Sequence, residues 1–168
     1  MIERVLSWAL ALTLAALLLF EVWQAFFWLT PNAVFGMIAL RSGIAFFEPG
    51  MRYITGALEM VAVVLLLWPA MRQRGAQLSL LVVLGAIAFH LSPWLGIAIP
   101  RPDIVSPMIA HGYTAADIDS FHPPTDQGAM FLLALVIAAL SVGLIFVERS
   151  KTRHALEPHT RRPAGVFA

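Results

Sequence analysis

Three ionisable side chains, Glu21, Glu59 and His90, lie inside long apolar stretches of the sequence. A charged group within a lipid bilayer costs about 3 kcal/mol or more, so such residues are rare and usually mark functional sites. At about 1.5 Å per helical residue, Glu21 lies about 24 Å, Glu59 about 12 Å and His90 about 20 Å from the start of its stretch. Across a hydrocarbon core about 30 Å thick, these depths place all three near the midplane or in the half that we expect to face outward.

Other polar residues are expected to join them. Arg52 precedes Glu59 by seven residues, which puts both on nearly the same side of a helix, and Asp126 directly precedes the last apolar stretch. We therefore predict an outward-facing polar pocket above an apolar inner half. Its candidate residues are Glu59, His90, Arg52, Asp126, Glu21 and Arg41, with Gln24 beside them. The alternative is that these groups pair between helices and specify packing, with no ligand.

Several kinds of chemistry are not indicated. The His, Asp and Glu residues show no metal-ligand spacing, and we predict no metal site. The sequence has no glycine-rich phosphate loop and no nucleophile elbow. It contains no cysteine, which excludes disulfides, thiolate nucleophiles and cysteine-bound iron–sulfur clusters within the chain. Nothing in the pattern suggests nucleic-acid binding.

The elements that must position the pocket are helices in a membrane. Hydrophobic residues make up 60% of the 168 residues, charged residues 12%, and the mean hydropathy is +0.80. We predict an all-α integral membrane four-helix bundle, with the lipid bilayer as its surroundings. The apolar stretch at 33–47 contains Arg41 and is too short to cross, so it is predicted to be a re-entrant or interfacial helix. The spans are predicted at about 5–29, 51–68, 77–99 and 128–147.

The remaining segments are polar. The loop from Pro100 to Gln127 is rich in proline and is predicted to be irregular, with at most a short helix near Ala115. Residues 1–147 form the predicted membrane domain, and residues 148–168 a basic, disordered tail. Placing both ends in the cytoplasm puts eight of the eleven basic residues there and leaves Arg41, Arg52 and Arg101 outside.

Sequence blocks along these elements resemble a known family. They are Glu48-Pro49, Arg52-Tyr53-Ile54-Thr55-Gly56-Ala57-Leu58-Glu59, Leu65-Leu66-Leu67-Trp68-Pro69, Ala86-Ile87-Ala88-Phe89-His90-Leu91 and Asp126-Gln127-Gly128-Ala129-Met130-Phe131. In this order they resemble the DoxX family of small membrane proteins, over most of the chain from Pro31 to Val147. The resemblance implies a four-helix bundle in the bacterial inner membrane, and some relatives are subunits of thiosulfate:quinone oxidoreductases.

The resemblance favours a redox-associated membrane subunit whose pocket holds a quinone headgroup or helps to assemble a partner protein. Glu59 and His90 are then expected to bond the quinone oxygens and relay protons, while Arg52 holds Glu59 ionised. Two alternatives remain, a structural accessory subunit without ligand and a carrier for a small solute or protons. The apolar inner half argues against a carrier. The redox partner, homo-oligomerisation and any enzymatic activity of its own are left open.

Overall fold

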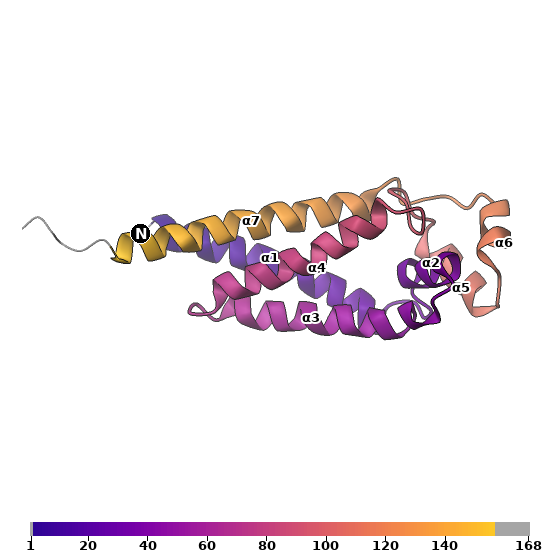
Figure 1. Ribbon diagram of the computed structural model, residues 1–168, viewed down its shortest axis with the longest axis horizontal. Coiled ribbons are helices and arrows are strands. Elements are labelled where there is room, and N and C mark those ends of the chain that lie inside the picture. The colour runs from indigo at the N-terminus through magenta and orange to yellow at the C-terminus, as the bar shows by residue number, and fades with distance from the viewer. Residues whose placement is uncertain (1, 157–168) are drawn as a thin grey trace, which may run out of the picture.

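Four long helices run side by side along the longest axis of the molecule (Figure 1). The structure is a computed structural model that describes residues 2–156, with side chains described as far as Lys151. The helix α1 packs against α3 and α7, and α4 packs against the same two helices. Within residues 2–156 no β-strand is present. The four long helices are α1 (Ile2–Phe27), α3 (Gly50–Leu67), α4 (Arg72–His90) and α7 (Ala129–Leu156).

Three helical segments are long and apolar enough to cross a membrane, namely Ile2–Phe27, Ala45–Leu67 and Ala129–Lys151. Between 28% and 33% of the most apolar window of each segment is buried within the protein, so most of these residues are at least partly exposed. A helix that is apolar on all sides suits a membrane better than water. The fourth long helix, α4, begins with the polar run Arg72-Gln73-Arg74 and is not among the three. The four-span bundle therefore stays a prediction.

The helix α4 differs from the predicted span at 77–99 at both ends. It starts at Arg72, before the predicted start at 77, and the turn that precedes it lies at 68–71, where the amide of Met71 donates to the carbonyl of Trp68. It stops at His90, because Pro93 disfavours a helical conformation at Ser92. The Ser92 hydroxyl donates to the carbonyl of Phe89 and accepts from the amide of Trp94, which fixes a turn instead.

The other three long helices start and end close to the predicted spans, with one exception. The helix α7 continues past Val147 to Leu156, into the region predicted to be a disordered tail. The rest of that predicted tail, residues 157–168, lies outside the described residues.

Short helices gather at the end of the molecule opposite the N-terminus (Figure 1). We call this group the cap, and it consists of α2 (Ala33–Ser42), η1 (Ala45–Phe47), α5 (Pro102–Ala110) and α6 (Ala115–Ser120). Its centre is a small apolar cluster formed by Ala33, Met37, Val105 and Ile118. The predicted helix at 33–47 corresponds to α2 and η1. Its placement in or on a membrane stays a prediction.

The loop from Pro100 to Gln127 is more ordered than predicted. The short helix near Ala115 is present as α6, but α5 was missed, because its two prolines suggested irregular structure. One of them, Pro102, occupies the first turn, where the missing N–H of proline costs nothing. A bridge between Pro100 and Thr125 ties the base of the loop together.

Candidate functional site

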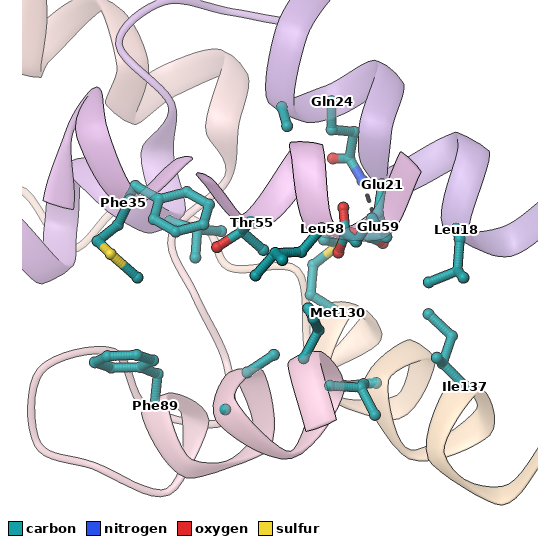
Figure 2. Close-up of a pocket in the computed structure, with 18 of the residues that line it drawn as sticks. Leu18, Glu21, Gln24, Phe35, Thr55, Leu58, Glu59, Phe89, Met130 and Ile137 are labelled. Carbon is teal, nitrogen blue, oxygen red and sulfur yellow. Dashed lines mark hydrogen bonds between the residues drawn. The ribbon is translucent and has the colours of Figure 1, made fainter. Parts of the chain in front are cut away.

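A cavity of about 310 Å³ lies between the long helices, in the half of the molecule next to the cap. It is largely apolar, and side chains from α1, α3, α4 and α7 form its walls, while the start of α2 lies at the cap end. Ligand pockets in proteins usually enclose about 300–1,000 Å³, so this one suits a single small group. Figure 2 shows the wall residues converging from these helices. The polar side chains on its wall are Glu21, Gln24, Asn32, Thr55, Glu59, Ser79 and His90.

Two carboxyl groups occupy one wall of the cavity. Glu21 projects from α1 and Glu59 from α3, and the two side chains lie beside one another (Figure 2). The amide of Gln24 donates to Glu21 at 3.5 Å. Glu59 is 8% exposed and has neither a hydrogen bond nor an ion pair within the part of the chain that the structure describes. A buried carboxyl group is thus held on an apolar cavity without a protein partner.

His90 is the last residue of α4, and it lines the same cavity. Its ring is buried and packs against the ring of Phe131, with the centroids 5.5 Å apart. Nδ1 lies 2.8 Å from the carbonyl oxygen of Gly96, and because a carbonyl only accepts, Nδ1 must donate. In the neutral ring Nε2 is then a hydrogen-bond acceptor, and it has no partner among the described residues.

Arg52 is not part of this cavity, although the sequence predicted it there. It is buried, and its Nη2 lies 3.4 Å from Glu48 Oε1 and donates to the hydroxyl of Tyr53 at 2.9 Å. Its Nη1 reaches the hydroxyl of Thr30 at 3.5 Å. The predicted pairing of Arg52 with Glu59 is therefore wrong. Arg52 pairs instead with Glu48, which lies one turn before it on the chain.

Asp126 and Arg41 do not line the cavity either, and both make bonds that hold parts of the fold together. Asp126 accepts from the amides of Ile99 and Gly128 through Oδ1 and of Met130 through Oδ2, which fixes the start of α7 against the base of the loop. Arg41 holds the cap together. Its Nη2 lies 2.7 Å from Asp119 on α6, and its Nη1 donates to the carbonyls of Trp94 and Leu95.

Of the six candidate residues, the structure thus brings three together, Glu21, Glu59 and His90. Thr55 was missed, and its position four residues before Glu59, on the same helix face, was the signal that would have found it. The apolar residues of the cavity wall, such as Phe35 and Met130, could not have been predicted, because their sequence pattern is the same as that of an ordinary hydrophobic core.

A second polar cluster, also missed, lies at the opposite end of the long helices. Arg72 is 1% exposed and donates to the hydroxyl of Ser7 at 2.7 Å and to the carbonyl of Leu66 at 3.0 Å. Its guanidinium lies over the ring of Trp8, 3.8 Å from the centroid. Glu148 accepts from Ser7 and from Lys151, and it lies 3.9 Å from Arg72. We call Ser7, Arg72, Glu148 and Lys151 the basal cluster.

These observations define an all-helical protein that has three helices able to cross a membrane by length and composition, and an apolar cavity lined by two carboxyl groups and a histidine. Among the described residues, no group of three or more His, Asp and Glu side chains is arranged to hold a metal ion. Comparisons with protein-family models, with curated proteins and with solved structures give no match. The resemblance to the DoxX family therefore stays a prediction.

Proposed function

We propose that this chain is a DoxX-like subunit of the bacterial inner membrane, and that its cavity binds the headgroup of a membrane quinone for a redox partner protein. The observation that carries the proposal is Glu59, a buried carboxyl group that faces an apolar cavity and has no partner within residues 2–151. An unpaired buried polar group costs about 1–3 kcal/mol. A ligand that bonds to it would offset that cost.

The chemistry of the wall suits a quinol. The two hydroxyl groups of a quinol are donors, and the Glu59 carboxylate and the Nε2 atom of neutral His90 are acceptors. On oxidation, the quinol releases two protons and two electrons. Glu59 and His90 accept the protons, and the electrons pass to the partner protein. In the reverse direction the same two groups return the protons to the quinone oxygens.

The proposed membrane placement has four crossings, with α4 as the fourth. Its 19 residues span about 28 Å at 1.5 Å per residue, close to a hydrocarbon core of about 30 Å. Arg4, Arg72, Arg74 and Lys151 all belong to the end of the molecule that carries the N-terminus (Figure 1). An excess of basic residues marks the cytoplasmic side, so this end is placed in the cytoplasm and the cap outside.

The test is native mass spectrometry of the protein extracted from its membrane in mild detergent. We expect the wild-type particle to carry a quinone, and Glu59→Gln to lose it. Glu3→Gln is the matched control, because Glu3 is an exposed carboxyl group at the far end of α1 and should leave the adduct intact. A wild-type particle without quinone would contradict the proposal and favour an accessory subunit without ligand.

A further inference from the structure

The cavity that contains Glu59 opens on one side of the molecule. Four of its wall residues are at the same time exposed on the outer surface, Leu58 on α3 and Leu81, Gly85 and Ala86 on α4. Leu58 is 41% exposed and Leu81 is 69% exposed. A residue that both lines a cavity and faces outward belongs to its mouth, so the mouth lies between α3 and α4.

Buried side chains close much of the remaining wall. Leu18 on α1, Val83 on α4, and Ala134 and Ile137 on α7 line the cavity and are at most 6% exposed. At the cap end the wall includes Asn32, which is buried and is tied to the backbone amides of Val34 and Phe35. The opening therefore lies on a flank of the helices, and this flank is apolar.

We propose that this mouth is a lateral portal, through which an amphiphile dissolved in the bilayer inserts a small hydrogen-bonding headgroup between α3 and α4 while its apolar tail stays in the lipid. The inference rests on the membrane placement proposed above. A cavity of about 310 Å³ lies at the small end of the range for ligand pockets, about 300–1,000 Å³, so it suits a headgroup better than a long tail. The leucines at the mouth suit a tail and offer nothing to a hydrated solute.

Gly85 makes the portal testable. A Cβ atom built at Gly85 meets no atom within 4 Å, so a side chain can begin there without a clash, and a large one would extend across the mouth. Gly143 on α7 offers the matched control, because a Cβ atom there also meets nothing within 4 Å and Gly143 is not part of the cavity wall. Gly85→Trp and Gly143→Trp thus add the same side chain to two open helix surfaces, only one of which is the portal.

The probe is dicyclohexylcarbodiimide, which dissolves in lipid and reacts with carboxylic acids in apolar surroundings. The acid proton goes to one nitrogen and the carboxyl oxygen to the central carbon, and acyl transfer to nitrogen then leaves a stable N-acylurea. The experiment uses full-length protein in liposomes, and tandem mass spectrometry locates the label. A water-soluble carbodiimide is added to a parallel sample to report access from the aqueous side.

We expect labelling of Glu59 or its neighbour Glu21 in the wild type and in Gly143→Trp, and loss of labelling in Gly85→Trp. Ala86→Leu, a milder obstruction of the same mouth, should lower the rate in proportion to its smaller size. Circular dichroism and gel filtration show whether each variant is folded. Labelling of a folded Gly85→Trp at the wild-type rate would overturn the portal, as would an unlabelled wild type or faster labelling by the water-soluble reagent.

Added quinone separates the portal from the proposed function. Protection of Glu59 by a quinone supports the quinone site, whatever the glycine variants do. Loss of labelling in Gly85→Trp without protection by quinone would keep the portal and remove quinone as its ligand. Protection by quinone together with unchanged labelling of Gly85→Trp would keep the ligand and overturn the route.

Discussion

The two ends of the helix assembly differ in how their buried ionisable groups are bonded. In the basal cluster, Arg72 and Glu148 are bonded to Ser7, and Lys151 bonds to Glu148 and Ser7. At the cavity next to the cap, Glu59 has no partner in the described part of the chain. Removing one member of a buried, paired group leaves the other unpaired, whereas removing a group that is already unpaired breaks nothing. Burial of a charge therefore does not by itself separate a structural role from a functional one.

The difference assigns separate roles to the two ends. The basal cluster joins the first turns of α1 and α4 to the last part of α7, which are far apart in sequence, and so fixes how the long helices meet. The cavity carries the Glu59 carboxyl group and Nε2 of His90, which have no partner among the described residues.

The largest effect is expected from Arg72→Ala, which takes a buried donor from Ser7 and from the carbonyl of Leu66, and removes one of the two cations beside Glu148. Breaking a buried charged pair by removing one partner costs about 3–5 kcal/mol. The free energy of unfolding, measured by titration with sodium dodecyl sulfate from a mild detergent, should fall by that amount. Arg74→Ala is the control, because Arg74 is exposed and two residues away. Equal free energies of unfolding for the two variants would show that the basal cluster does not stabilise the fold.

His90→Ala should have a smaller effect on stability, because it removes one hydrogen bond, from Nδ1 to the carbonyl of Gly96, and one ring contact, with Phe131. A single bond of this kind is worth about 1 kcal/mol. The same unfolding titration measures the change. His111→Ala is the matched control, since His111 also lies against a backbone carbonyl but is exposed to solvent. A loss as large as that of Arg72→Ala would show that the cavity end also depends on its polar groups for folding.

Within the cap, Arg41 and Asp119 should be coupled weakly. The two side chains are 21% and 53% exposed, and exposed ion pairs contribute about 0.2–1 kcal/mol because solvent screens them. A double-mutant cycle of Arg41→Ala and Asp119→Ala on the unfolding free energy should give a coupling energy within that range. A coupling energy of several kcal/mol would show that this ion pair stabilises the cap as strongly as the basal cluster is expected to stabilise the long helices.

The smallest effect concerns the start of α6. The side chain and backbone amide of Thr114 donate to Asp117, and they hold the pKa of this carboxyl group below its ordinary value of 3.8. Because the pKa is lowered in the folded state, the contribution is complete above pH 3.8 and is lost as the pH falls through the lower, folded value. The protection of the α6 amides against hydrogen exchange, relative to an unstructured peptide at the same pH, should therefore fall only in that acidic range. Asp117→Asn should abolish this pH dependence. A variant that keeps the same pH profile would exclude Asp117 as the cause.

Much of the fold follows from hydropathy alone. Long apolar runs and their proline and glycine ends place α1, α3 and the start of α7, because continuous apolar stretches of this length are typical of membrane helices. The early end of α4 could also have been predicted from Pro93. The continuation of α7 to Leu156 could not, because it depends partly on Glu148 and Lys151 finding Ser7 on a distant helix.

The candidate site was predicted in part for a physical reason. Depth in the apolar stretches identified Glu21, Glu59 and His90, and depth is a property of the sequence. The partners of Asp126 and Arg41 are set by tertiary contacts with Ile99 and Asp119, which no helical spacing reveals. Glu48, in contrast, lies four residues before Arg52, and this spacing could have identified it. The sequence therefore identified the side chains that line the cavity, but it could not separate them from side chains that are bonded within the protein.

The binding role of Glu59 is tested by the unfolding free energy of Glu59→Leu, measured with and without a short-chain quinone, beside that of Glu148→Leu. A ligand at 100 times its dissociation constant adds about 2.7 kcal/mol to the stability of the state that binds it. We predict that Glu59→Leu is at least as stable as the wild type without quinone and gains nothing when quinone is added, whereas Glu148→Leu is less stable and still gains. A Glu59→Leu variant that is destabilised as much as Glu148→Leu, or that is still stabilised by quinone, would contradict the account.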